Sequence, residues 1–538
     1  MEELNKANKL LSFALERYHS ACSTLLNSSQ RTSNLPRSQT LLDCVENELS
    51  SISIYEAIME RAKAAVSRTR NMIRTPASWT ILPDEIWGHV FCLVRDMHPC
   101  YLQEKTREDH KLAQTWYPEL FTHVCYRWRR IAIGHSPLWT HIDIIPRHSQ
   151  SKQFYDRGMA FVSRSEGSPR TLHIDDRYGS THDAHADLSV FLAQLSTRID
   201  ALEVAFDSCR QPFALQSCLA NCVPGTLRQL SLTDTCDEHT CIPIDRPGLI
   251  ADGANSSYLD LHEDSIERTM IPIQKLYLTA CYFHWGSRAY AGLTELHLLP
   301  HSDRMLSITQ SELVQVLASS PQLRMLRIGI RIAGGDTTSP LVPVRLKNLE
   351  VLDFRFGLHE VYPTFFALLS PKTKPLQMSL RYFSRDDSPL NNSVVKKFFS
   401  ASKITQLYMN GPFEGIQLLD LLALLPHLRT LVLSNFSMPF GRSTSPNIFF
   451  SLWHPPLETL RLVNCTIGVP ELQAIAEMHP IKALIVQGCN YRLVDGTIAP
   501  DRDEHREAYF IGTASTVRFV EDPPSIEMLY SGKWDPWE

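Results

Sequence analysis

The chain has 538 residues, of which 43% are hydrophobic and 21% charged, and 53 basic against 58 acidic residues give a net charge of −5. This balance argues against a nucleic-acid-binding protein, which needs a strong basic excess, and the hydrophobic fraction argues against a disordered chain. No apolar run of about 18 residues indicates a membrane span, and the start lacks the order of a secretory signal. Thirteen cysteines that never form CxxC are typical of reduced thiols. We therefore expect a cytoplasmic or nuclear protein with no nucleic-acid or membrane partner.

Residues 1–75 are expected to form a helical, coiled-coil-like arm. Apolar residues recur there at alternating spacings of three and four, as on one side of a helix. They are Leu42, Val45, Leu49, Ile52, Met59 and Val66. The polar stretch NSSQRTSNLPRS separates this helix from an earlier one. Two interpretations stay open: the arm packs on its neighbouring helix, or it self-associates through this seam.

Residues 81–139 predict a small helical unit with a polar insertion at about 95–115. Pro83 stands at a favoured helix start, and Ile86 and Val90 begin an apolar stripe on the first helix. A second helix carries Val124 and Trp128 on one face, and PLW closes the unit.

Residues 140–490 contain an apolar triplet, L-x-x-L-x-L, in thirteen strong or weak copies. Its central residues are Ile142, Leu172, Leu202, Leu230, Leu276, Leu296, Leu326, Leu352, Met378, Leu407, Leu431, Leu460 and Leu484. Helical patterns stand between several copies, and most copies follow one another at 20–30 residues. This α/β pattern predicts a leucine-rich-repeat solenoid with parallel strands on the concave face and helices outside. An ordinary α/β domain would instead have longer Val/Ile-rich buried strands.

Two segments interrupt or follow the repeats. Residues 233–270 are polar and rich in turn residues, which predicts a surface insertion. Residues 491–538 are expected to form a C-terminal cap and tail, in which residues 516–520 add a final strand.

The residue between the two core positions of each triplet should point outward, where a partner can reach it. Arg and Tyr are enriched among the residues that dominate binding. The candidate client-binding residues are Tyr277, Arg327, Arg355, Arg381, Tyr408 and Arg461. Arg327, Arg355 and Arg381 fall on consecutive strands and could recognise a phosphorylated or acidic segment. Asp353 could instead neutralise two of them and leave a solvated face of mixed charge.

Residues 81–139 resemble the F-box of fungal F-box proteins that carry a leucine-rich-repeat-like C-terminal domain. The matching residues are Leu82, Pro83, Glu85, Ile86, Val90, Phe91, Val124, Cys125, Arg127, Trp128, Arg129, Ile131, Ala132, Pro137, Leu138 and Trp139. The insertion at about 95–115 departs from a compact F-box.

The resemblance implies the substrate-recognition subunit of a Skp–cullin–RING ubiquitin ligase. Such a subunit docks a Skp-family adaptor through the F-box and an unknown protein substrate through the repeats. A small helical unit cannot bury all its apolar side chains, which favours an exposed docking patch. The expected adaptor contacts are Leu82, Pro83, Ile86, Val90 and Val124. The expected F-box core is Phe91, Trp128, Ile131, Leu138 and Trp139.

No catalytic sequence motif stands out. GxSxG, HExxH, P-loop and GxGxxG patterns do not occur, and the spacing of CDEHTC (236–241) fits no standard zinc site. We therefore expect no enzyme activity of its own, no cofactor and no metal. The alternatives are a leucine-rich-repeat interaction scaffold that does not direct ubiquitination, and a repeat protein whose box no longer binds an adaptor.

Overall fold

The computed structural model describes most of the chain. The described residues are 2–31, 39–74, 82–97, 118–146, 151–177, 184–195, 199–207, 213–235, 240–241, 259, 261–300, 307–333, 342–355, 361–371, 373–381, 392–411, 418–437, 456–493, 496–499, 506–520 and 536–537. The chain divides into two compact units, Met1–Trp87 and Gly88–Glu538. This division falls inside helix α4 (Asp84–Asp96), within the segment that resembles an F-box. The predicted insertion at 95–115 lies almost entirely outside the described residues.

The first unit contains two long helices, α1 (Glu2–Arg31) and α2 (Gln39–Arg74). The hydroxyl of Tyr18 donates a 2.7 Å hydrogen bond to Glu48 across them. Of the six seam residues, Ile52 is half-buried. The other five are exposed: Leu42, Val45, Leu49, Met59 and Val66. Their exposure leaves both interpretations of the arm open.

A single sheet organises the second unit. Its 14 strands run in sequence order, and every neighbouring pair is parallel. The strands are β1 (His141–Ile144), β2 (Arg170–Asp175), β3 (Ile199–Phe206), β4 (Gln229–Asp234), β6 (Lys275–Thr279), β8 (Glu295–Leu299), β10 (Met325–Ile328), β12 (Val351–Phe354), β13 (Leu376–Arg381), β14 (Ile404–Asn410), β15 (Thr430–Ser434), β16 (Leu457–Val463), β18 (Ile481–Gln487) and β21 (Ala514–Val520).

The predicted triplets set the register of this sheet. Each central residue pairs with the central residue of the next copy, from Ile142 opposite Leu172 to Leu460 opposite Leu484, and all thirteen are buried. The final strand adds Val517 opposite Leu484. Since one buried row passes through every strand, the prediction of an α/β fold built from parallel-stranded, leucine-rich repeats is confirmed.

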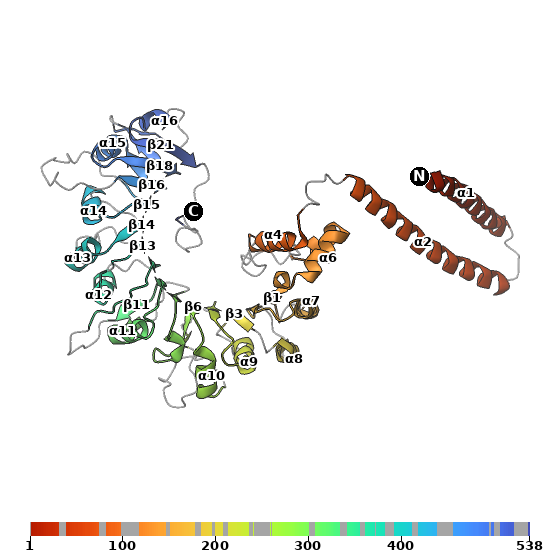
Figure 1. Cartoon of the computed structure of the whole chain (residues 1–538), viewed down its shortest axis with the longest axis horizontal. Helices are drawn as coiled ribbons and strands as arrows, with labels where there is room; N and C mark the ends of the chain where they lie inside the picture. Colours follow the sequence, from red (N-terminus) through yellow and green to blue (C-terminus); the bar gives the residue numbers. More distant parts are fainter. Residues whose placement is uncertain are drawn as a thin grey trace. The chain divides into compact units, whose positions relative to one another are not determined.

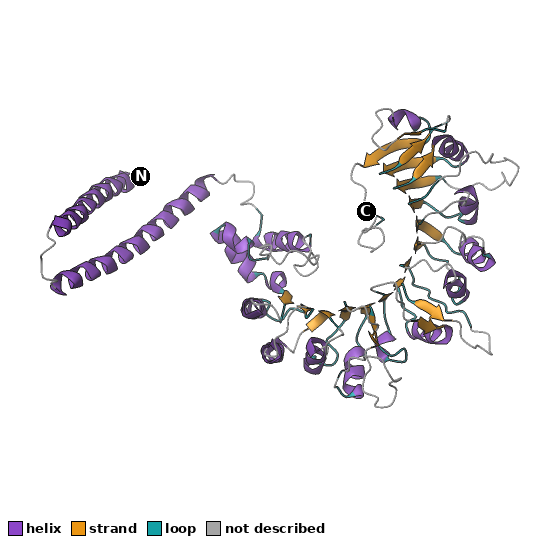
Figure 2. Ribbon diagram, turned by 180° about the vertical axis from the view of Figure 1, so that it is seen from behind, coloured by secondary structure: helices purple, strands orange, loops and turns teal. Residues whose placement is uncertain are grey.

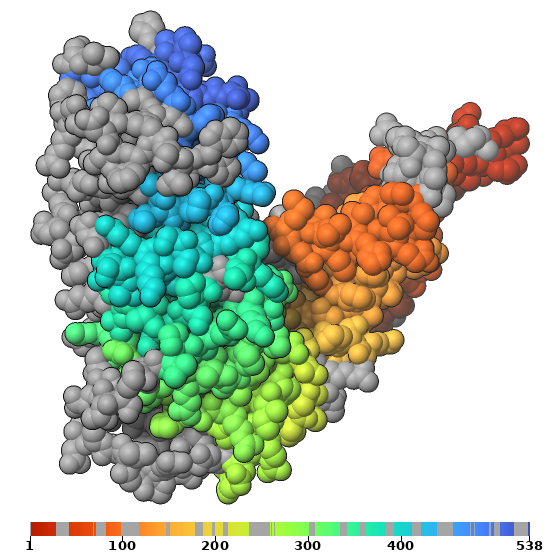
Figure 3. Space-filling model, turned by 60° about the vertical axis from the view of Figure 1, so that its left-hand side comes forward, coloured from red at the N-terminus to blue at the C-terminus, as the bar shows by residue number. Residues whose placement is uncertain are grey.

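Helices follow most strands and lie on the outer side of the curved sheet, whereas the strands line its inner side (Figures 1 and 2). They are α7 (Ser151–Arg164), α8 (Ala184–Leu195), α9 (Phe213–Asn221), α10 (Glu263–Met270), α11 (Gln310–Ser319), α12 (Val361–Ala367), α13 (Ser393–Ala401), α14 (Leu418–Leu424), α15 (Val469–Met478) and α16 (Arg506–Tyr509), with a 3₁₀ helix η2 (Arg288–Tyr290). In the space-filling view of Figure 3, the surface colours run from green through cyan to blue in sequence order along the repeats, so each repeat lies beside its neighbours in the sequence.

Several short strands lie outside the main sheet, most of them in the segments that follow its strands. They are β5 (Thr240–Cys241), β7 (Cys281–Tyr282), β9 (Ser307–Thr309), β11 (Arg331–Ala333), β17 (Thr466–Gly468), β19 (Asn490–Arg492) and β20 (Ile498–Ala499). The predicted insertion at 233–270 is described only in part: its first two residues finish β4, and its last eight form α10.

Candidate functional site

Before the sheet, the chain forms α4, α5 (Phe121–Val124), α6 (Tyr126–Gly134) and the 3₁₀ helix η1 (Ser136–Trp139). Pro83 precedes α4, and Asp84 and Glu85 occupy its first turn, where negative charge suits the positive helix end. The SPLW segment that closes the unit is η1.

The expected adaptor contacts of this segment are mostly exposed. The exposed fractions are 39% for Leu82, 45% for Ile86 and 56% for Val124. Pro83 is also exposed, and Val90 is half-buried. Leu93, which follows Ile86 by seven residues on α4, is 65% exposed. A row of apolar side chains along one helix is thus open to solvent.

The expected F-box core residues form an aromatic cluster and a joint to the sheet. Phe91 stacks on Phe121 at 4.4 Å between ring centroids and lies 4.9 Å from Trp128. Phe91, Ile131, Leu138 and Trp139 are buried, whereas Trp128 is half-buried.

Trp139 joins the helical segment to the first repeat. Its indole Nε1–H donates a 2.7 Å hydrogen bond to the carbonyl of Ala132 on α6. Its ring packs edge-on against Phe161 of α7 at 5.0 Å, beneath the guanidinium of Arg164. This joint ties residues 118–139 to the start of the solenoid.

The concave face presents one outward side chain per strand between the two core positions. The register aligns these residues in one row: Asp143, His173, Glu203, Ser231, Tyr277, His297, Arg327, Asp353, Ser379, Tyr408, Val432, Arg461, Ile485 and Arg518. Four of the six expected client-binding residues lie in this row. Arg381 follows Ser379 by two residues and shares its face, as Arg355 does after Asp353.

The middle of the row holds a cluster of arginines around one acid. Asp353 Oδ2 lies 2.7 Å from Nε of Arg355 and 3.5 Å from Nε of Arg327. The Arg381 guanidinium lies 5.7 Å from the ring centroid of Tyr408. Two of the three guanidinium groups pair with Asp353, so three positive charges face one negative charge and the cluster carries a net positive charge.

Accessibility differs within the cluster. Arg327 keeps 32% of its side chain exposed, whereas Arg355, Arg381 and Tyr408 are largely or fully buried. Burial and the neighbouring charge of Arg355 lower the pKa of Arg381, and burial raises the pKa of Tyr408 to about 12. Arg327 is therefore the member that a partner reaches most easily.

The two remaining candidates lie away from this cluster. Tyr277 donates a 2.5 Å hydrogen bond to Glu295 and stacks on His297 at 4.2 Å. Arg461 donates to Gln487 Oε1 at 3.1 Å and to the carbonyl of Pro536 at 3.4 Å. Pro536, two residues before the end of the sequence, is buried, so the chain itself contacts this end of the concave row.

One group at the start of the row was not predicted from the sequence. His141, Asp143 and His173 bring their side-chain ligand atoms within 4.8 Å of one another. The signal was present in WTHIDI and RTLHI, because these triplets place Asp143 and His173 at the outward position. His141 precedes Asp143 by two residues and shares its face.

Comparisons with known proteins identify no family. No protein-family model matches the chain, and a search of curated proteins found no relative. Among solved structures the chain is similar to an internalin from Listeria monocytogenes, at 12% identity and a TM-score of 0.26. The match covers 72% of this chain and 89% of that chain. The repeat fold is shown by the 14-stranded parallel sheet and not by this likeness. Among the described residues, no helix is long and apolar enough to cross a membrane.

Proposed function

We propose that this protein is the substrate-recognition subunit of a Skp–cullin–RING ubiquitin ligase. The segment at 81–139 acts as the F-box and docks a Skp-family adaptor. The concave face of the repeats binds a protein client, and the transfer chemistry belongs to the partner subunits. The F-box pattern is the basis for naming the adaptor, and the repeat fold is the basis for a binding scaffold.

The observation that carries the adaptor proposal is the exposure of apolar side chains next to a well-packed core. Ile86 and Leu93 on α4 are open to solvent, whereas Phe91 on the same helix is buried. Burying one such aliphatic side chain contributes about 1.5–3 kcal/mol. Several of them together would offset the entropy that two proteins lose on association. An adaptor with a complementary apolar groove is the partner this surface fits.

The adaptor proposal predicts that Leu82→Ala combined with Pro83→Ala abolishes co-purification with a Skp-family adaptor. Both side chains are exposed, so the repeats should keep their circular dichroism and melting temperature. The measurement is a pulldown of the full chain from cells that co-express the adaptor.

The matched control for this pulldown is Val342→Ala combined with Ile511→Ala. Both residues are exposed apolar side chains in the repeat unit, and their loss should leave adaptor capture intact. Equal capture by the wild type and the Leu82/Pro83 variant would refute docking through these two residues, which precede α4.

The second candidate function is a binding scaffold that does not direct ubiquitination. The curved sheet could bind a client even if residues 81–139 bind no adaptor. Proteins captured by both the wild type and the Leu82/Pro83 variant are client candidates. Arg327→Glu should release such a client if the arginine cluster binds it. Reconstituted ubiquitin transfer to that client separates the two functions, because a scaffold would capture the client without promoting transfer.

A further inference from the structure

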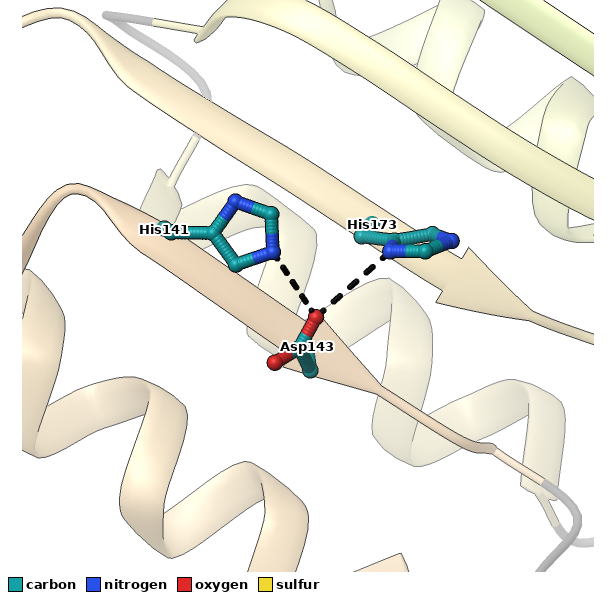
Figure 4. A group of neighbouring side chains, drawn as sticks. All are labelled: His141, Asp143 and His173. Atoms are coloured by element: carbon teal, nitrogen blue, oxygen red, sulfur yellow. Dashed lines mark hydrogen bonds and ion pairs between the residues drawn. The ribbon is translucent and has the colours of Figure 1, made fainter. Parts of the chain in front are cut away.

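The first two strands of the sheet bring two imidazoles to one carboxylate. His141 and Asp143 stand two residues apart on β1, and His173 on β2 is the register partner of Asp143. Oδ1 of Asp143 lies 3.0 Å from Nε2 of His141 and 3.6 Å from Nδ1 of His173. Figure 4 shows both rings turned toward the same carboxylate oxygen.

Strand geometry accounts for this convergence. Residues two apart on a strand point to the same face, and register partners on neighbouring strands lie about 5 Å apart. Asp143 and His173 are buried, and His141 is half-buried. The group is therefore held by the backbone of the sheet, and it opens to solvent on the His141 side.

We propose that His141, Asp143 and His173 bind a divalent transition-metal ion of the zinc type. The ligand atoms would be Nε2 of His141, Oδ1 of Asp143 and Nδ1 of His173. This metal site is independent of the proposed function. Its ligands are two imidazoles and a carboxylate, whereas the proposed adaptor-binding surface is apolar.

The spacing and the donor set fit such an ion. Zinc bonds to nitrogen and oxygen are about 2.0–2.2 Å long, so two ligand atoms of a tetrahedral site lie about 3.3 Å apart. The observed separations of 3.0 Å and 3.6 Å fall on either side of that value. Two imidazoles with one carboxylate suit zinc and related metals. Three protein ligands leave one position for water or for a side chain of a bound protein.

Neighbouring charged side chains orient the Asp143 carboxylate for metal binding. Nη1 of Arg157, on α7, lies 3.8 Å from Oδ2 of Asp143 and so engages the oxygen that faces away from the imidazoles. The positive charge of Arg157 is balanced by its ion pair with Glu119. On the other side of His173 the register places Glu203, whose negative charge favours a bound cation. Outer partners of this kind orient metal ligands in proteins.

The test is zinc binding to the full chain. The protein is stripped with a chelator, its accessible thiols are alkylated because Cys22 and Cys44 are exposed, and zinc chloride is titrated by calorimetry. We expect one ion per chain in the wild type. Loss of an outer-shell partner typically weakens metal binding about 10–100-fold. His173→Gln and the near-isosteric Asp143→Asn remove ligands themselves, so each should weaken it at least about 100-fold.

Cobalt provides a second readout, since its visible spectrum reports the ligands. A site of nitrogen and oxygen donors gives d–d bands without the thiolate-to-cobalt charge transfer that cysteine ligation would add. The matched control is His297→Gln, which removes a histidine from the same concave row and should bind zinc like the wild type. Absence of zinc binding by the wild type would overturn the proposal. Retention of full affinity in both ligand variants would also overturn it, because other residues would then hold the ion.

Discussion

His297 lies on the concave face in surroundings that oppose its protonation. The ring is half-buried and stacks on Tyr277. Burial, together with the positive charges of Arg327, Arg355 and Lys275, lowers the pKa of His297 to about 3. This imidazole is therefore neutral in the folded protein throughout the mildly acidic range.

The His297 surroundings predict a loss of stability in acid. Below the ordinary histidine pKa of 6.5, the His297 imidazole binds a proton in the unfolded chain but stays neutral in the folded chain. The free energy of unfolding therefore falls as the pH drops from 6.5 toward 3. Between pH 7 and pH 5 this group should cost up to about 2 kcal/mol. Urea unfolding of His297→Gln should show a weaker pH dependence by that amount. His262→Gln, at an exposed position, is the control, and equal pH dependence in all three proteins would contradict the assignment.

The turns that leave the strands form a recurring element. Asn464 and Gly488 have φ angles of 51° and 63°, and each stands immediately before a buried cysteine. The Cys465 thiol lies 3.4 Å from the carbonyl oxygen of Leu433, and the Cys489 thiol lies 3.3 Å from that of Leu462. The thiols thus satisfy backbone groups of the preceding strands while they fill the core.

Gly488→Ala tests this turn. A left-handed backbone conformation costs a residue with a Cβ about 1–2 kcal/mol, so the urea midpoint of the variant should fall. Gly134→Ala is the control, because no heavy atom lies within 4 Å of the added Cβ and the residue ends helix α6. The same substitution should there leave stability unchanged or slightly raised. Equal destabilisation by both changes would contradict the turn argument.

The strands were predictable because each depends on a local pattern of three apolar residues. The helices over SELVQVLASS and VPELQAIAEM were likewise visible from their apolar spacing, and they correspond to α11 and α15. The short strands β17 and β19 were not predicted. Each has only three residues, which is too few for a period-two pattern to stand out.

At the scale of the molecule, the sheet unit is a one-dimensional stack. Each strand pairs only with the strands of the neighbouring repeats, so stability is a sum of local and nearest-neighbour contributions. At its C-terminal end, Phe510 is buried against Tyr491 at 5.4 Å and Phe519 at 5.8 Å between ring centroids. This cluster covers the core of the last repeats.

Phe510→Ala should therefore destabilise one end of the stack. Truncating a buried phenylalanine costs about 3–5 kcal/mol, and we expect faster amide hydrogen exchange in β16, β18 and β21. Exchange in β1 to β3 should stay unchanged. Ile511→Ala, at the exposed neighbouring position, should affect neither end. A uniform acceleration over all strands would show that the stack unfolds as a single cooperative unit.

The candidate surfaces could be predicted only in part. The outward row follows from the triplets, so Arg327 and Tyr277 could be assigned to one face from the sequence alone. The burial of Arg381 and Tyr408 could not, because it depends on contacts between distant segments. The meeting of His141 with His173 depends on the register between two strands, which only the three-dimensional structure provides.

The alternation along each strand separates two sets of residues with different roles. The buried central residues determine whether the stack holds together, whereas the residues between the core positions determine the chemistry of the concave face. Replacements confined to the second set would therefore change that chemistry without disturbing the buried rows. A designer could follow the same route by replacing Ser231 and Ile485, which are half-buried on the concave face, while leaving the buried leucines in place.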